Sequence, residues 1–298
     1  MKLKVPVLLI TILLGLIVLS GHLRAASSDP EAVLPNRVSK KELASIEKKY
    51  PNVWNHIKYY RATRTVHITV KFKDKQNTNN YYKKQITIPR NTIVNGDKSI
   101  VYYSRNKANA EFTFDASTFS YKMLKPVLTS QMVQPDAKLS AKKMSSINKY
   151  FVRVKRPSFM PAYSTGALNK YLGDHVKFSP FFPSTNRLKI TPDGYIEYAR
   201  PNSNAQYTYQ LFNLVPNAYV KIQKFRVKNN TRYLYYSHHL KGVSDRRVAT
   251  SGRAQYRLTV KNLHRPFTMF DGDQGALLMS QYRIGKTTYY TRSGSFSA

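Results

Sequence analysis

The sequence predicts a mainly β protein with short helices, built from two or three small antiparallel β modules of SH3-like or barrel-like type in tandem. One stretch occurs twice, as YSRNKANAEFTF at 103–114 and as YARPNSNAQYTY at 198–209. Upstream of each copy, Lys40–Tyr50 resembles Lys142–Tyr150, and both have helical spacing. Much of the remaining chain alternates apolar and polar residues, as half-buried strands do. We therefore predict a duplicated unit, an organisation typical of binding arrays.

Residues 1–26 have the features of an export signal. Lys2 and Lys4 precede an apolar run at 5–20, and Ala25 and Ala26 supply small residues for cleavage. The run is shorter than the ~20 residues of a membrane-spanning helix. The alternative is an uncleaved anchor that holds the protein to the membrane through residues 5–20. In both cases we expect an extracellular protein, associated with the cell wall or cell surface.

The first module is expected at 39–124, after a flexible lead-in at 27–38. Ser39 and Glu42 have the spacing of a capping box, and Pro51 ends the helix that they begin. Asn95-Gly96-Asp97 predicts a tight turn. Strands are expected at 66–72, 81–88, 100–103 and 111–114.

A linker at 125–138, which contains two prolines, separates this module from a second one at 139–218. Ser140 is expected to cap a helix at 141–150, and Thr191-Pro192-Asp193-Gly194 predicts a turn. Residues 219–298 form a third, divergent β module without a leading helix. Strands of the second and third modules are expected at 151–154, 176–178, 188–191, 195–198, 233–237, 254–260 and 281–284.

The charge balance indicates the class of partner. The chain carries 49 Lys and Arg against 15 Asp and Glu, a formal net charge of +34. Solubility of a small domain requires a magnitude of only ~2–8. The excess predicts a polyanionic partner: nucleic acid, anionic lipid or an acidic wall polymer. The chain has no Cys, which excludes disulfides and zinc–thiolate sites and, for an exported protein, favours a Gram-positive source.

Candidate ligand contacts combine basic residues with tyrosines, because guanidinium groups pair with phosphates and aromatic rings stack on planar groups. Arg105 and Arg200 come first, since they occupy matching positions of the duplicated stretch. The alternative is that each stacks on its neighbouring tyrosine and braces a hairpin. For each tyrosine, the alternative is a place in the core of a strand. The other candidates are Tyr103, Tyr198, Tyr82, Lys83, Lys84, Arg232, Tyr235 and Arg292.

Catalytic and metal-binding patterns are weak. His238 and His239 are adjacent, so on a strand they would point to opposite faces and not share one ion. The acidic turn at 271–275 lacks the later carboxylates of a calcium loop. Asp193 and Glu197 are explained by hairpin chemistry better than by a glycosidase pair. We therefore predict a binding protein rather than an enzyme, without metal or cofactor.

Two segments carry a resemblance to a known group of proteins. They run from Lys83-Lys84-Gln85-Ile86-Thr87-Ile88-Pro89 through Val101-Tyr102-Tyr103, and from Leu188 to Ile196. With the export signal, they resemble secreted lactic-acid-bacterial surface proteins that have S-layer-associated (SLAP-like) or bacterial SH3-like wall-binding repeats. The resemblance covers about residues 57–298. The chain departs from it by carrying a helix before each of the first two modules.

The resemblance implies non-covalent attachment to wall polymers such as teichoic acid or peptidoglycan. We expect a secreted protein that holds anionic envelope polymer through basic and aromatic surfaces. Two alternatives remain open at this point: a secreted adhesin that binds host matrix or nucleic acid, and an envelope enzyme of unrecognised type.

Overall fold

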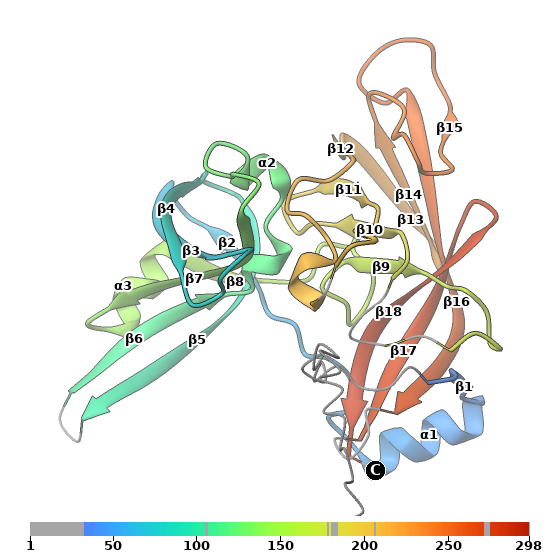
Figure 1. The fold of residues 1–298 in the computed structure, drawn as a ribbon, viewed down its shortest axis with the longest axis horizontal. Coiled ribbons are helices and arrows are strands. Elements are labelled where there is room, and N and C mark those ends of the chain that lie inside the picture. The colour runs from blue at the N-terminus through green and yellow to red at the C-terminus, as the bar shows by residue number, and fades with distance from the viewer. Residues whose placement is uncertain are drawn as a thin grey trace, which may run out of the picture.

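The computed structural model describes residues 33–104, 107–177, 179, 184–205, 207–270 and 275–297. Two curled antiparallel sheets form the centres of two lobes (Figure 1). Helices are few and short, so the predicted mainly β class is confirmed. The predicted export signal lies outside the described residues. Within the described ranges, no helix has the length and apolar character needed to cross a membrane.

The N-terminal lobe is a sheet with the strand order β4-β3-β7-β6-β5-β2-β8. Burial alternates along β3, where Val66, Ile68, Val70 and Phe72 enter the core. The elements are β2 (Tyr59–Ala62), β3 (Val66–Asp74), β4 (Tyr81–Ile88), β5 (Ile93–Ser104), β6 (Lys107–Phe114), η1 (Ala116–Thr118), α2 (Tyr121–Leu124), β7 (Met132–Ala141), α3 (Met144–Tyr150) and β8 (Phe151–Val154).

The C-terminal lobe has the strand order β12-β11-β10-β9-β18-β17-β16-β14-β13. Its strands are β9 (Ala167–Lys170), β10 (Arg187–Ile190), β11 (Tyr195–Ala199), β12 (Ala218–Lys221), β13 (Lys224–Lys228), β14 (Thr231–Tyr236), β15 (Arg246–Arg247), β16 (Tyr256–Phe270), β17 (Ala276–Ile284) and β18 (Thr287–Phe296), and η2 (Thr208–Gln210) follows β11. The first elements of the described residues, β1 (Asn36–Arg37) and α1 (Lys40–Lys49), also belong here. β1 pairs with β16, and Trp54 bridges to Gly294.

The predicted start of the first helix is confirmed, and the predicted start of the second is wrong. At α1, Ser39 and Glu42 form the predicted capping box. The helix predicted at 141–150 corresponds to α3, which begins at Met144, and Ser140 does not cap it. Ser140 lies on β7 and its hydroxyl donates to Glu111. Because β7 pairs with β6 as far as Ala141, these residues cannot also enter the helix.

The turn predicted at Asn95-Gly96-Asp97 is wrong, because all three residues lie inside β5. A Cβ on Gly96 would lie 2.5 Å from the Phe112 ring of β6. The glycine therefore permits a close approach between strands, which is the other use of glycine in a sheet. In contrast, the turn at 191–194 is confirmed: it joins β10 to β11, and Gly194 has φ 83°.

The linker predicted at 125–138 contains part of a central strand, β7, which lies between β3 and β6. Pro135 made this stretch look irregular, because proline is rare in central strands. A β-bulge accommodates it: Gln134 has φ 42°, and the register with β3 shifts between Phe72 and Lys73. The strand predicted at 176–178 is absent at 176 and 177, and residue 178 lies outside the described ranges.

The sheets divide the chain differently from the modules predicted at 39–124, 139–218 and 219–298. α1 packs with the C-terminal lobe, whereas α3 and β8 complete the N-terminal one. Strands β12 to β18 extend the sheet that β9 to β11 begin, so they form no separate third module. In the first copy of the repeated stretch, residues 107–114 form a strand; in the second, residues 200–205 and 207 are irregular and η2 follows. The two copies do not occupy corresponding positions.

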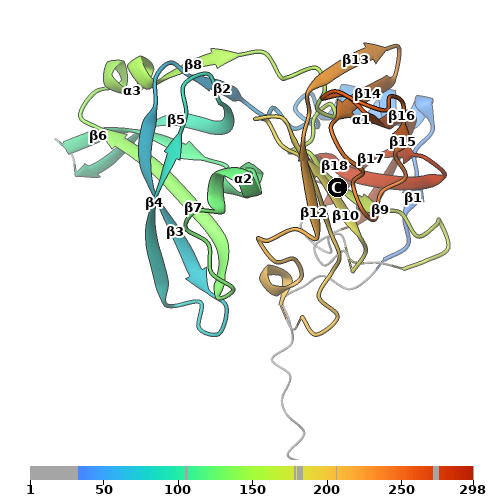
Figure 2. The ribbon, with the colours of Figure 1, turned by 90° about the horizontal axis from the view of Figure 1, so that it is seen from above.

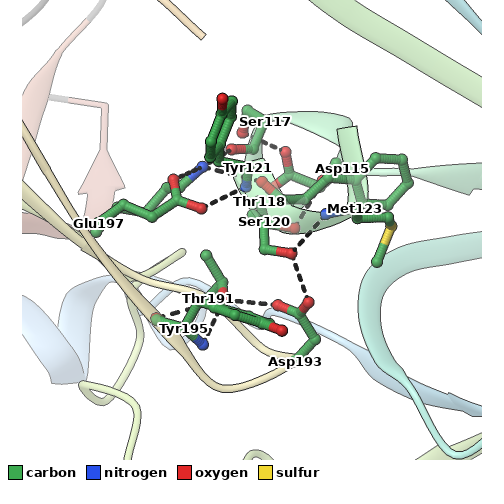
Figure 3. Close-up of polar contacts among 12 residues, drawn as sticks. Asp115, Ser117, Thr118, Ser120, Tyr121, Met123, Thr191, Asp193, Tyr195 and Glu197 are labelled. Atoms are coloured by element: carbon green, nitrogen blue, oxygen red, sulfur yellow. Dashed lines mark hydrogen bonds and ion pairs between the residues drawn. The ribbon is translucent and has the colours of Figure 1, made fainter. Parts of the chain in front are cut away.

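The lobes meet through α2, which lies on the side of the N-terminal lobe that faces the C-terminal one (Figure 2). The Ser120 hydroxyl donates to Asp193 over 2.6 Å, and the Tyr121 N–H donates to Glu197 (Figure 3). Lys189 pairs with Glu197 at 2.8 Å and also donates to the Phe119 carbonyl at 3.0 Å. The carboxylates of Asp193, in the β10–β11 turn, and of Glu197, on β11, thus hold the N-terminal end of α2.

Candidate functional site: a cationic sheet face

The predicted basic pair on β4 does not act as one site. Lys83 lies opposite Lys71 of β3, and Lys84 lies opposite Val70, so the two lysines leave the strand on opposite faces. Both are exposed. Their neighbour Tyr82 donates its hydroxyl to Asp74. The hairpin therefore presents separate cations and a tyrosine whose hydroxyl already has a partner.

The repeated Tyr-x-Arg segments place their tyrosines in unlike environments. Tyr198 is buried in the core, against Gly242. Tyr103 is 53% exposed and donates to the buried carboxylate of Glu111 at 2.7 Å. Arg200 is exposed, and its backbone N–H donates to Asn217. Arg105 lies outside the described residues.

The Glu111 carboxylate gives the N-terminal lobe a predictable acid response. The hydrogen bond from Tyr103, together with Lys138 and Ser140, holds the pKa of Glu111 below its ordinary 4.5. Its contribution to stability is therefore present above pH 4.5 and is lost as the pH falls through the lowered pKa. We expect Glu111→Gln to lower the melting temperature at pH 7 and to change it less at pH 3. Thermal melts of both proteins across this range measure the difference, and equal shifts at both pH values would contradict it.

Three further predicted contact residues lie in the C-terminal lobe. Arg232 is buried, and its Nε donates to the carbonyls of Met160 at 2.9 Å and Ser158 at 3.1 Å. Burial lowers the pKa of Arg232, which serves as a brace between loop and sheet. Arg292 is exposed near the end of β18 and donates to Ser295. Tyr235 is half-buried on the outer side of β14 and belongs to a larger surface.

That surface is the solvent-facing side of β13, β14 and β16, at the upper right of Figure 1. Directly opposite residues of antiparallel strands share a face, so the strand registers define rows across it. The first row is Lys224, Tyr235, Arg257 and Arg246; the second is Arg226, Tyr233 and Thr259; the third is Lys228, Thr231, Lys261 and Arg283. We call these residues the cationic face. None of them is acidic.

The opposite side of the same strands explains why the charges point outward. Leu234, Leu258, Val260 and Ile284 alternate with the basic residues and lie in the core. A shift of one residue in register would bury the cations and expose these apolar side chains. The hydrophobic core therefore fixes the outward side of β14 and β16, and the pairing of β13 with β14 places the lysines and arginine of β13 on that side.

Like charges meet directly on the cationic face. Arg246 lies opposite Arg257, and Lys261 lies opposite Arg283. Such pairs destabilise a sheet when nothing neutralises them. Tyr233 separates some of the charges, and the Arg257 guanidinium lies 5.3 Å from its ring centroid. An anion laid along the rows would relieve this repulsion.

The protein's own carboxylates are committed elsewhere. Among the described residues, every Asp or Glu other than Asp136 accepts a hydrogen bond from a named donor. Only Arg37, Lys58, Lys138 and Lys189 of the described Lys and Arg pair with a carboxylate. Most of the positive charge therefore has no internal counter-ion.

The two adjacent histidines have different partners. His239 pairs with Asp245 at 2.6 Å, while His238 contacts Ser237. Asp245 also accepts from the Tyr236 hydroxyl and so acts as the centre of a loop. The described part of the chain contains no group of three or more His, Asp or Glu side chains arranged to hold a metal ion.

The list of candidate contact residues omitted the basic residues of the face on β13, β15, β16 and β17. Their signal was the alternation Lys224-Phe225-Arg226-Val227-Lys228, which places three cations on one side of a strand. The cationic face can bind a flexible polyanion through many charge contacts with two aromatic rings between them. A scan of known protein families and searches of curated proteins and of solved structures found nothing that matches this chain.

Proposed function

We propose that this protein is an extracellular binding protein that holds an anionic polymer of the cell envelope, of the teichoic-acid type, on its cationic face. The observation that carries the proposal is the set of acid-free rows on β13, β14 and β16. On β13 the basic residues Lys224, Arg226 and Lys228 recur at every second position, so a linear polyanion lying along that strand meets successive charges. We propose binding rather than catalysis, since the face holds no acid–base pair.

Electrostatic binding of this kind has a measurable signature. Each phosphate contact releases counter-ions, so affinity falls steeply as salt rises. We expect retention on poly(glycerol phosphate) to decline linearly with salt on logarithmic axes. Replacing Lys224, Arg226 and Lys228 together by glutamine is expected to reduce that slope by about 2. Titrations between low and moderate salt, with both proteins, measure the change.

The β3–β4 hairpin supplies a matched control. Lys71, Lys83 and Lys84 are also exposed strand lysines, and their replacement by glutamine removes the same charge. We expect this variant to keep nearly the parental slope. If both triple variants lose binding equally, charge spread over the whole surface is responsible. If retention on the polymer does not change with salt, the electrostatic mechanism is wrong.

The partner is tested by comparing cell wall that carries teichoic acid, wall stripped of it, and single-stranded DNA at equal phosphate concentration. We expect the intact wall to retain the protein and the stripped wall to lose most of it. Tighter binding to DNA than to the wall polymer would favour the alternative function in nucleic-acid binding.

A further inference from the structure

A groove of about 690 Å³ lies where the two lobes meet. The N-terminal lobe contributes the β4–β5 turn and α2, and the C-terminal lobe contributes the β10–β11 turn and the β12–β13 turn. Figure 2 shows α2 between the lobes. Figure 3 shows Met123, Asp193 and Tyr195 where α2 meets the β10–β11 turn. The volume falls within the range of ~300–1,000 Å³ that small-molecule sites occupy.

The walls of the groove are largely apolar. Phe159 and Phe225 meet edge to face, with ring centroids 5.4 Å apart, and Ile222 lies beside them. Met123 and Val127 face them from the other lobe. Phe225 remains 43% exposed, although it lies on the core side of β13. The groove therefore offers apolar surface that the protein's own side chains do not fill.

Three cations lie at the same groove: Arg90, Lys122 and Lys221. Arg90 and Lys122 form no ion pair within the described residues. Lys221 lies 4.4 Å from the Tyr195 ring and donates to the backbone carbonyl of Asp193.

The lining has one acidic side chain, Asp193, against these three cations. Asp193 accepts hydrogen bonds from the Ser120 and Thr191 hydroxyls, each at 2.6 Å, so both its oxygens are used. Burial raises the pKa of Asp193 and lowers that of Lys221. Because three cations line the groove against one carboxylate, its rim is positive around an apolar interior.

We propose that this groove binds an amphiphilic anion, a molecule with one phosphate group and one alkyl or acyl chain. Arg90, Lys122 and Lys221 contact the phosphate, and the chain lies against Phe159, Phe225 and Met123. Because residues of both lobes contact the ligand, binding also ties the lobes together. The site is separate from the cationic face, since Phe225 and the lysines of β13 point to opposite sides of that strand.

The test uses a lysophosphatidic acid with a twelve-carbon chain, held below its micelle concentration, in isothermal titration calorimetry. We expect binding at one site per chain. Inorganic phosphate alone and the uncharged monoacylglycerol of equal chain length are each expected to bind at least tenfold more weakly. A stoichiometry of several ligands per protein, or equal binding of phosphate alone, would overturn the proposal.

Two pairs of variants locate the site. Phe225→Ala is expected to weaken lysophosphatidate binding about tenfold, because it removes an aromatic wall. Val227→Ala is the matched control, since Val227 lies on the same side of β13, is 40% exposed and lies outside the groove. Arg90→Gln is expected to weaken binding about tenfold, whereas Arg226→Gln on the cationic face leaves it unchanged.

The same variants separate this proposal from the polymer-binding one. Phe225→Ala leaves every cation of the cationic face in place, so retention on poly(glycerol phosphate) stays at the parental level. Equal lysophosphatidate affinities of Phe225→Ala and Val227→Ala would reject the groove while leaving the polymer proposal standing. The triple variant of Lys224, Arg226 and Lys228 tests the cationic face independently of the groove. We expect it to lose polymer retention, whereas Phe225→Ala does not.

Discussion

Replacing Glu197 by alanine is expected to destabilise the protein by about 3–5 kcal/mol, because a buried ion pair then loses one partner. The side chain of Glu197 is 6% exposed and that of Lys189 is 17% exposed. The substitution leaves the Lys189 ammonium facing a protein interior without a counter-charge. It also removes the acceptor of the Tyr121 N–H, at the point where α2 meets the other lobe.

A second cation near the same carboxylate adds to the expected loss. Burial lowers the pKa of Arg187 to about 10, and Glu197 opposes that shift. The Arg187 guanidinium also lies 3.9 Å from the Phe212 ring centroid, which holds it in place. Removing Glu197 therefore leaves two partly buried cations of β10, Arg187 and Lys189, without this carboxylate.

The control is an ion pair of similar length in an exposed place. Asp97 pairs with Lys58 at 2.7 Å, and their side chains are 57% and 35% exposed. Asp97→Ala is expected to cost no more than about 1 kcal/mol, since water solvates the freed lysine. Urea unfolding of both variants gives the comparison. A Glu197→Ala protein as stable as Asp97→Ala would show that the lobe contact contributes little.

Local chemistry explains the parts of the fold that the sequence analysis predicted correctly. The Ser39–Glu42 capping box and the turn ending at Gly194 each depend on four adjacent residues. In both, the residues that make the contacts are neighbours in the sequence. Strand alternation at β3 and β4 is equally local, which is why their predicted bounds lie close to the observed ones.

The errors arise where a distant partner decides the outcome. Gly96 has the sequence context of a turn, but the ring of Phe112 on the neighbouring strand needs the space. Pro135 resembles a linker residue, but a bulge against β3 admits it into a central strand. Asp193 and Glu197 look like ordinary hairpin residues, and only the arrangement of the lobes shows that they hold α2.

The candidate site shows the same limit. The alternation of side chains along a β-strand predicts that Arg232 and Tyr235 lie on opposite faces of β14, but it does not determine which face is exposed to solvent. The pairing of β14 with β13 and β16 decides this: it buries Arg232 and places Tyr235 among exposed cations. The similarity of the segments at 103–114 and 198–209 was misleading for a related reason. The two similar sequences adopt different structures because they pair with different strands.

The second large effect is expected in the aromatic core of the N-terminal lobe. Phe112 is fully buried and contacts three rings: it stacks on Phe151 at 4.6 Å, meets Tyr60 edge to face at 4.9 Å and lies 4.6 Å from Phe114. We expect Phe112→Ala to cost about 3–5 kcal/mol, because it removes buried area and leaves a cavity among rigid rings. Urea unfolding followed by far-ultraviolet circular dichroism measures this loss.

Tyr102 provides the matched aromatic control, because it lies on β5 directly beside β6 but is 74% exposed. Tyr102→Ala is expected to change stability by no more than about 0.5 kcal/mol. The contrast tests the assignment of β6 to the interior rather than the hydrophobicity of aromatic residues in general. Since Phe112 also covers Gly96, a small effect of Phe112→Ala would mean that β5 and β6 do not approach as closely as the packing at Gly96 requires.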